Sequence, residues 1–380
     1  MSGFIERVSR RSGKISRIGI AVSAALGLLA LFAASCAGVP ARTGQSGGAA
    51  RAPLWVNDLE AGYPAADWAA GTGSGANREA AENAARMALA RMFKTDVKSL
   101  TATNQRLSEI VKEAAGKKTV IFDESSEISQ TVNTTSNVQG LIGVEMDTYQ
   151  GADEWYACAR MNRKESAARY SNVIKEGAAA VSSLAARGRA AGATMEGYAA
   201  FAFAVPLAEV TDNYQNILEV LDPAASNRRP AYGGAAAIRD SMRACAAKIT
   251  IAVTVKLSGG GATSREETTI RRALAAFFTD RGFKAREGGT GDYALDANVT
   301  LEAQAGTKLL SCRYYFDTAL KDRNGKAVFS STEDKRASDL DAAGARRLAL
   351  RDLESSITNK ENKEGTFAQD FAAWLGELLE

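Results

Sequence analysis

The chain has 380 residues, of which 46% are hydrophobic and 24% are charged, with a formal net charge of +3. This content is enough to fill folded cores, and the length exceeds that of one typical domain, so we expect two domains. The sequence contains no histidine. This excludes Ser-His-Asp triads, Cys-His pairs and histidine-based zinc sites, because each depends on an imidazole.

The N-terminal segment has the pattern of an export signal. Its basic lead contains Arg7, Arg10, Arg11, Lys14 and Arg17. Residues 18–35 then carry no charge, which is typical of the hydrophobic region of a signal peptide. The run ends in Ala33-Ala34-Ser35-Cys36, which resembles a lipobox with alanine where leucine is common. The sequence therefore predicts a signal peptide over residues 1–35 and a lipid, such as palmitate, on Cys36.

An uncleaved membrane anchor is the alternative for the same segment, because its uncharged run approaches the about 20 residues that span a hydrocarbon core. Gly19, Ser23 and Gly27 dilute that run, so we favour the lipid anchor. In both cases the bulk of the chain lies beyond a membrane. Ala37 and Gly38 lack the aspartate that retains some lipoproteins in the inner membrane. We therefore expect a cell-envelope location at the outer membrane, facing the periplasm.

Cleavage also changes the charge. Removal of residues 1–35 lowers Lys+Arg from 47 to 42 and Asp+Glu from 44 to 43, which leaves a net charge near −1. The positive charge thus belongs to the signal peptide, and the sequence predicts no nucleic-acid partner.

The remaining chain divides by composition. Residues 36–53 are rich in Gly, Ala, Ser, Arg and Pro, which is typical of a flexible tether. Residues 54–162 and 248–380 carry mixed strand and helix patterns, whereas residues 163–247 are Ala-rich and helical in period. The predicted fold class is α+β: two small sheet-and-helix domains joined by an Ala-rich helical segment.

The first domain opens with a strand and a helix. Trp68–Gly73 is a short extended run, and Asn77 is an N-cap residue for a helix that ends near Phe93. Small residues at three- and four-residue spacing form its expected buried stripe: Ala81, Ala84, Ala88 and Met92. Later segments are predicted to be extended: 120–122, 139–147 and 154–161.

Glycines cluster just before this helix, in Gly71-Thr72-Gly73-Ser74-Gly75. We expect them to supply a tight strand-to-helix turn. The alternative is an anion cradle at the helix N-terminus, although the Lys-Ser/Thr of a phosphate-binding loop is absent.

Prolines punctuate the helical segment. A stripe of Met195, Tyr198, Phe201, Ala202 and Val205 indicates one buried helix face. Pro206 is expected to kink or break that helix, and Pro223 and Pro230 mark further breaks.

The second domain has the clearest alternation. Apolar residues at every second position predict strands at 249–257, 295–301 and 314–320, and Asp322–Gly325 is a hairpin signal. Gly259–Gly261 turns the first strand into a helix whose apolar face is Ile270, Leu274, Phe277 and Phe278. The last helix has an apolar face made of Phe367, Phe371, Trp374, Leu375 and Leu378.

The cysteines give no sign of a metal site. Cys158, Cys245 and Cys312 stand far apart in the sequence, without the close pairs of a zinc site. They are buried thiols, or two of them form a Cys245–Cys312 disulfide.

Charged pairs are the remaining candidates for chemistry. Carboxylates pair at Asp123-Glu124 and Asp153-Glu154, and basic residues pair at Arg228-Arg229 and Arg271-Arg272. Both kinds are typical of solvated surfaces. We therefore predict no catalytic residue, no cofactor and no metal, and we do not expect an enzyme.

Several motifs of the first domain resemble one family. They are Pro53–Val56, Tyr63-Pro64, Trp68–Gly73 ahead of the alanine-spaced helix, and Trp155–Met161. Together, over about residues 53–170, they resemble the LPP-twenty family of bacterial lipoproteins. The resemblance implies an envelope lipoprotein with a compact β-α-β-β module and no established active site.

These observations favour a membrane-anchored envelope lipoprotein that binds or scaffolds other envelope proteins without catalysis. One alternative, from the family resemblance, is a flagellar or envelope assembly component. Another is a glycan hydrolase that uses two carboxylates, since such chemistry requires neither histidine nor metal.

Overall fold

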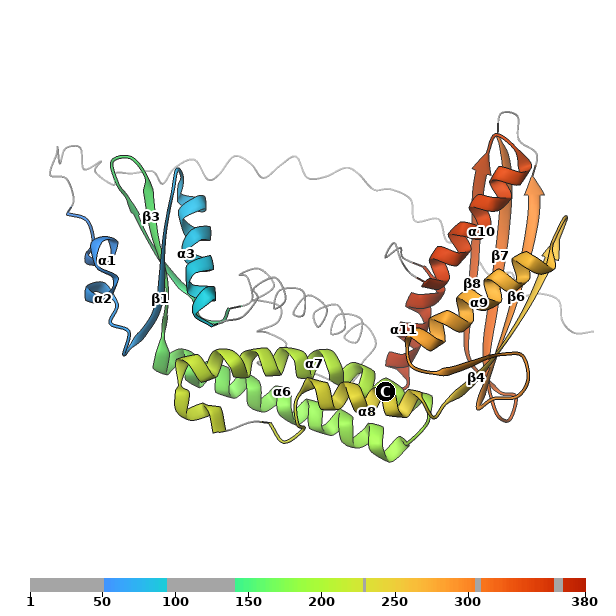
Figure 1. The fold of residues 1–380 in the computed structure, drawn as a ribbon, viewed down its shortest axis with the longest axis horizontal. Coiled ribbons are helices and arrows are strands. Elements are labelled where there is room, and N and C mark those ends of the chain that lie inside the picture. The colour runs from blue at the N-terminus through green and yellow to red at the C-terminus, as the bar shows by residue number, and fades with distance from the viewer. Residues whose placement is uncertain (1–50, 94–140, 228–229, 305–308, 359–364) are drawn as a thin grey trace, which may run out of the picture. The chain divides into compact units, whose positions relative to one another are not determined.

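The computed structural model describes residues 51–93, 141–227, 230–304, 309–358 and 365–380 (Figure 1). Cys36, the expected signal peptide and nearly all of the expected tether lie outside these residues, as does the expected strand at 120–122. The described part is mixed α+β and contains a three-stranded antiparallel sheet and a five-stranded mixed sheet. The predicted α+β class is confirmed at this level.

The three-stranded sheet follows two short helices, α1 (Leu54–Asn57) and α2 (Leu59–Gly62). Its strand order is β1-β3-β2, with β1 at Trp68–Gly75, β2 at Glu145–Gln150 and β3 at Trp155–Asn162. Helix α3 (Arg78–Met92) covers one face. The Asn77 side chain caps it by accepting a hydrogen bond of 2.8 Å from the Ala80 backbone N–H, as predicted. Residues 141–144, predicted to be extended, precede β2 as a turn.

The sequence led us to expect that the glycines of β1 form a turn, and this prediction is wrong. Gly71 and Gly73 lie within the strand, paired with Ala159 and Ala157 of β3. A Cβ atom at Gly71 would lie 2.3 Å from the backbone nitrogen of Leu89, and one at Gly73 equally close to that of Ala85. The glycines therefore let the α3 backbone rest directly on the strand.

This close approach also corrects the predicted stripe of α3. The buried residues are Ala81, Ala85, Leu89 and Ala90, while Ala84 and Ala88 are half-buried and Met92 is 39% exposed. The backbone of α3 at Ala85 and Leu89 contacts β1 directly. The buried side of the helix is therefore centred on these residues and not on Ala84 and Ala88. Leu89, which the small-residue pattern passed over, is fully buried.

The Ala-rich segment is helical, as predicted. Its elements are α6 (Arg163–Ala191), α7 (Met195–Leu221), the 3-10 helix η1 (Pro223–Asn227) and α8 (Ala235–Ala246). Pro206 is buried within α7 and does not break it. A proline costs a helix interior about 3 kcal/mol. The packing of α7 against both α6 and α8 offsets that cost.

The five-stranded sheet has the order β5-β4-β6-β7-β8. Its strands are β4 (Thr250–Gly259), β5 (Lys284–Glu287), β6 (Tyr293–Gln304), β7 (Leu310–Asp322) and β8 (Ala327–Asp339). Strand β4 is parallel to β5 and β6, and the pairs from β6 to β8 are antiparallel. The covering helices are α9 (Ser264–Asp280), α10 (Ala342–Thr358) and α11 (Phe367–Glu377).

The alternating residues of this sheet are buried as predicted, except for Leu257, which is half-buried. The four-residue face of α9 is also buried. Gly259 and Gly261 turn the chain between β4 and α9 with φ of 108° and 75°. Gly325 closes the predicted hairpin with φ of 78°. Strand β5 was missed because its four residues, Lys-Ala-Arg-Glu, carry three charges and lack an apolar alternation.

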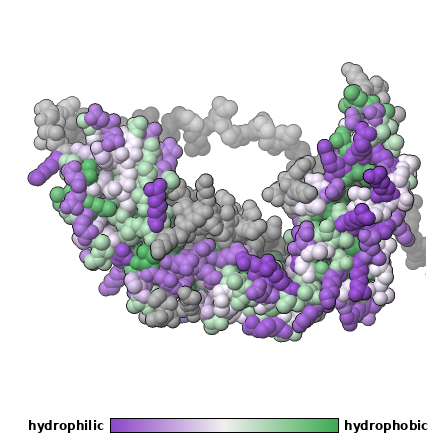
Figure 2. Space-filling view, in the orientation of Figure 1, coloured by the Kyte–Doolittle hydropathy of each residue, from purple (hydrophilic) through white to green (hydrophobic). Residues whose placement is uncertain are grey.

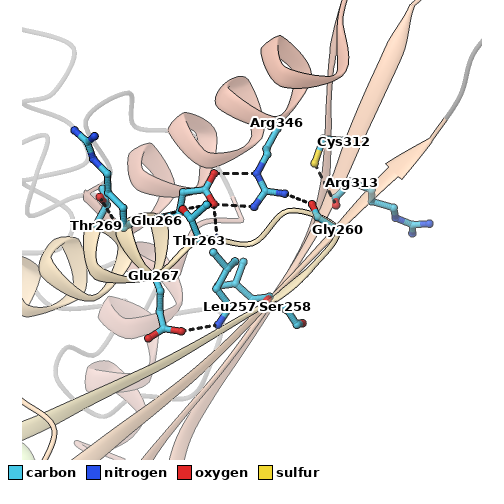
Figure 3. A network of polar contacts seen from close by, with 12 residues as sticks. Leu257, Ser258, Gly260, Thr263, Glu266, Glu267, Thr269, Cys312, Arg313 and Arg346 are labelled. Atoms are coloured by element: carbon cyan, nitrogen blue, oxygen red, sulfur yellow. Dashed lines mark hydrogen bonds and ion pairs between the residues drawn. The ribbon is translucent and has the colours of Figure 1, made fainter.

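A polar clamp joins α10 to the start of α9 (Figure 3). The Arg346 guanidinium donates to both carboxylate oxygens of Glu266, at 2.9 and 2.8 Å, and to the Gly260 carbonyl at 2.7 Å. Glu266 also completes a capping box with Thr263. The hydrogen bonds from Arg346 lower the pKa of Glu266 to about 2. The clamp thereby fixes two of the helices that cover the sheet.

Arg163 connects the helical segment to the residues that precede β1. The Arg163 side chain, at the start of α6, donates to the carbonyl of Ala65 at 2.8 Å and to that of Val220 at 2.6 Å.

Figure 2 shows small separate hydrophobic areas among hydrophilic residues on the viewed face. Among the helices of the described ranges, none is both long and apolar enough to cross a membrane.

Candidate binding groove

A groove lies between the edge strand β8 and helix α11. The strand contributes Ala327, Val328, Phe329 and Ser330, and the helix contributes Asp370, Ala373, Trp374 and Glu377. The helical residues follow an i, i+3, i+4, i+7 spacing and therefore share one side of α11. The cavity volume is about 420 Å³. This is within the range of pockets that hold ligands or anchor side chains.

The strand wall is an open sheet edge with a bulge. In the described part of the chain, β8 pairs with β7 alone and ends the sheet. Leu320 pairs with Phe329 and Lys321 pairs with Ala327, so Val328 has no residue opposite it. Bulges bend a strand and are common at sheet edges and beside functional sites. The groove thus contains backbone of a long edge strand at the point where its regular pairing is interrupted.

Aromatic rings form the floor. Phe329 and Trp374 are only 6% and 7% exposed, and their ring centroids lie 5.3 Å apart. Phe371 lies beneath, 5.7 Å from Phe329 and 5.4 Å from Trp374. Edge and tilted ring contacts of this kind stabilise a core beyond simple burial. These rings therefore lie behind the groove and hold α11 against β8.

The helix wall is acidic. Asp370 and Glu377 both line the groove. Asp370 accepts a hydrogen bond from the Ser331 hydroxyl, which holds the start of α11 against β8. These carboxylates line the groove, so it suits a ligand with a basic group.

A buried carboxylate positions the N-terminal end of α11. Glu333 of β8 has a side-chain exposure of 2% and forms an ion pair of 3.1 Å with Lys335. It accepts a hydrogen bond of 2.7 Å from the Phe367 backbone N–H, and another from the Ser356 hydroxyl. A carboxylate at a helix N-terminus is favoured by the free N–H groups there. Burial, followed by the Glu333 charge, raises the pKa of the neighbouring Tyr314 above its usual range.

Arg187 of α6 holds the other end of α11. Its guanidinium donates to the carbonyls of Leu378 and Leu379, the first at 2.8 Å, and pairs with Glu196 at 3.0 Å. Cations stabilise the exposed carbonyls at a helix C-terminus. Since both ends of α11 are tied to the surrounding fold, the groove is preformed.

The residues that the sequence offered as candidates for chemistry or lipid attachment do not line this groove within the described part of the chain. Cys36, Asp123-Glu124 and Arg228-Arg229 are outside the described residues. Asp153 and Glu154 are at the β2–β3 turn, away from the groove lining. Arg271 pairs with Glu267 and Glu287, and Arg272 is exposed.

All three described cysteines are free and buried, which confirms the buried-thiol interpretation over a Cys245–Cys312 disulfide. Burial raises the pKa of Cys158 to about 12. Such a thiol is a poor nucleophile at neutral pH. Groups of His, Cys, Asp and Glu suited to hold a metal ion are absent from the ranges that the structure describes.

The outer face of the three-stranded sheet carries a second polar cluster. The Arg160 guanidinium lies 4.8 Å from the Tyr63 ring centroid and 5.0 Å from that of Trp68. It also forms ion pairs with Asp147 at 3.1 Å and with Glu145 at 3.2 Å. Because its charge is matched within the cluster, we assign Arg160 a structural role.

Sequence reasoning missed the groove, although it found one of its walls. The apolar face of the last helix contains Phe371 and Trp374, both of which are buried as predicted. The register break at Val328 depends on pairing with β7 and has no local sequence signature. Helix α10 stands between β8 and α11 in the chain, so the order of the elements did not indicate that α11 lies beside β8.

Comparisons with known proteins give no family. No protein-family model matches the chain, and no curated protein matches it. Among solved structures, it is similar to the secreted protein HP1454 from the human pathogen Helicobacter pylori. The identity is 13% and the TM-score 0.36, covering 77% of this chain and 96% of that chain. A likeness this remote indicates neither an activity nor a partner.

Proposed function

We propose that this protein is a lipid-anchored envelope lipoprotein that binds an extended segment of another envelope protein in the groove between β8 and α11. The observation that supports this best is the groove itself, which combines an open strand edge, an aromatic floor and two carboxylates. The proposal includes lipid on Cys36, the resemblance to the LPP-twenty family, and an outer-membrane location facing the periplasm. It also includes the arrangement of two sheet domains joined by residues 163–247.

Strand addition is the binding mode that fits such a groove. An extended peptide pairs its backbone with a free sheet edge, while pockets between strand and helix accept alternate side chains. Here the peptide backbone would pair with β8 beside Ser330. An apolar side chain would rest on Phe329 and Trp374, and a basic one would meet Asp370 or Glu377.

Binding fits the two carboxylates better than hydrolysis does. Asp370 and Glu377 lie on the same side of one helix, about 10.5 Å apart along its axis at 1.5 Å per residue. Glycosidases instead place two carboxyl groups on opposite sides of the bond that is cleaved, at about 5 to 9.5 Å. Asp370 is also engaged by Ser331. We therefore propose a function without catalysis.

Site-directed photo-crosslinking in cells tests the groove. A photoreactive residue at Ser330, which is exposed in the groove, is expected to form an adduct with one envelope protein. The same residue at Thr254, exposed on β4, is the positional control. Identical adducts from both positions, or none from Ser330, would contradict the proposal.

A filled groove provides the matched variant. Ala373→Trp places an indole in the groove and is expected to abolish the Ser330 adduct. Ala372→Trp adds the same side chain at the preceding position of α11, which is exposed and outside the groove, and is expected to leave the adduct intact. If both variants keep the adduct, the partner binds elsewhere.

The lipid anchor is tested separately. The mass of the mature N-terminus from membrane fractions is expected to show an acylated Cys36, and Cys36→Ser is expected to release the protein from the membrane. An unmodified, uncleaved N-terminus would support a transmembrane anchor over residues 18–35 instead.

Deletion of the gene tests the flagellar alternative. Loss of motility in the deletion strain would support a role in the flagellar apparatus.

A further inference from the structure

The open face of the five-stranded sheet carries a group of basic side chains. Helices α9 and α10 lie against the opposite face (Figure 1). On the open face, Lys256 extends from β4, and Lys284 and Arg286 extend from β5, at positions that alternate with the buried residues of β4. Lys248 directly precedes β4, and the Lys284 backbone N–H donates to the carbonyl of its neighbour Ile249. These four basic residues form what we call the basic patch.

The positive charge of the basic patch is not neutralised by nearby carboxylates. All four side chains are exposed, and none forms an ion pair within the described part of the chain. Asp292, whose carboxylate accepts a hydrogen bond from the Thr250 backbone N–H at the start of β4, is paired with Arg323. Asp296 of β6 is paired with Lys321 at 2.7 Å. The patch therefore keeps its charge available for a partner.

The other half of the open face differs in charge. Arg313 of β7 pairs with Asp334 of β8. Arg336 of β8 and Asp317 of β7 are exposed and carry opposite charges. The charges of this half balance, so the excess of positive charge belongs to β4, β5 and the residue before β4.

The form of the patch suits an extended anionic surface. Its four cations are distributed over two strands of a sheet face, and none of them lines the groove at β8. A leaflet that contains anionic phospholipids presents many phosphates in one layer. Each Lys or Arg near such a leaflet strengthens binding about fivefold. Because the expected anchor already holds the chain at a membrane, a contact of modest strength is sufficient.

We propose that the basic patch docks onto anionic phospholipid headgroups of the membrane that holds the anchor. This inference rests on the proposed membrane anchor, whether lipid or helix, and not on the groove or its partner. Docking adds a second, electrostatic contact to the anchor and restricts how the second sheet is oriented at the membrane surface.

Acetylation of lysines in reconstituted vesicles tests the docking. The full chain, purified from membranes, is placed in vesicles of phosphatidylcholine, with or without phosphatidylglycerol. We expect Lys248, Lys256 and Lys284 to be acetylated more slowly when phosphatidylglycerol is present, as measured by mass spectrometry. Lys175, exposed on α6, should react equally in both. At about 1 M salt the protection should be lost, because the Debye length is then about 3 Å.

Two matched double variants separate the patch from the overall charge. Lys284→Gln with Arg286→Gln is expected to weaken docking about 25-fold, so that Lys256 loses its protection. Arg265→Gln with Arg272→Gln removes the same charge from exposed positions of α9, on the other side of the sheet, and should keep the protection. Thermal unfolding shows that each variant is folded.

Flotation of the same vesicles reports the anchor separately. Protein that floats with neutral vesicles but shows no protection with phosphatidylglycerol would overturn the docking alone. Protein that floats only with anionic vesicles, with its patch protected, would overturn the anchor alone. Protection that survives at high salt, or in the Lys284 and Arg286 double variant, would contradict docking through this patch. Protection in native membrane fractions but not in lipid vesicles would assign the patch to an acidic envelope protein instead.

Discussion

Helices cover one face of each sheet, but the residues at the helix–sheet contact differ. The first sheet has glycines there, and the second has aromatic side chains. In the first, Gly71 and Gly73 place the α3 backbone directly on β1. In the second, Phe329, Phe371 and Trp374 hold α11 away from β8 with whole rings. Backbone contact leaves no space between helix and strand, whereas ring contact leaves a groove where the rings end. Side-chain size at the helix–sheet contact thus accounts for the close contact in the first sheet and for the groove in the second.

Removal of one ring from the second sheet should have the largest effect. Phe371 is 1% exposed and contacts the rings of Phe277, Phe278, Phe329, Phe367 and Trp374. Phe371→Ala is expected to lower the free energy of unfolding by about 3–5 kcal/mol through the cavity it creates. Urea unfolding measures this. Phe371→Leu should cost clearly less, and an equal loss for both would show that cavity volume is not the cause.

Addition of one methyl group to the first sheet should be the next largest effect. In Gly73→Ala the new Cβ would lie 2.3 Å from the Ala85 backbone nitrogen, so α3 must move away from β1. We expect a loss of about 2–3 kcal/mol in urea unfolding. Ser74→Val, on the opposite and exposed face of β1, is the control and should change stability little. If Gly73→Ala is neutral, the close contact is not required.

The clamp on α9 and α10 should give the smallest effect, and one that depends on pH. Glu266→Gln is expected to cost about 1–2 kcal/mol at pH 6, because charge-assisted hydrogen bonds to Arg346 are lost. The pKa of Glu266 is lowered to about 2, below the usual value of about 4.3 for glutamate. Its contribution is therefore complete above the usual value and is lost as the pH falls towards 2.

Unfolding of wild type and Glu266→Gln at pH 6 and pH 2.5 measures this difference. The gap between the two curves should narrow at the lower pH. Glu267→Gln removes the neighbouring ion pair with Arg271 and should cost only a few tenths of a kcal/mol, as for other pairs along one helix. A gap for Glu266→Gln that is the same at both pH values would contradict the role given to its charge.

Local patterns predicted much of the second sheet. Strands β4, β6 and β7 alternate apolar and polar residues over long stretches, and this alternation is the direct result of one buried face. Asn77 and Gly325 mark a helix start and a turn for equally local reasons. Each of these predictions needs only the residues nearest in sequence.

Other features depend on contacts between distant segments and were missed or misjudged. The role of Gly73 follows from where α3 docks, and the continuity of α7 through Pro206 follows from its two helical neighbours. The groove requires the register break at Val328 and the position of α11 together.

Amide hydrogen exchange of β8 tests the central claim most directly. The experiment compares the free protein with the complex formed by the partner that the Ser330 crosslink identifies, and the short edge strand β5 serves as an internal control. We predict that amides of residues 327–333 exchange more slowly in the complex, while those of 284–287 are unchanged. Unchanged exchange in β8, with new protection elsewhere in the chain, would contradict strand addition in this groove.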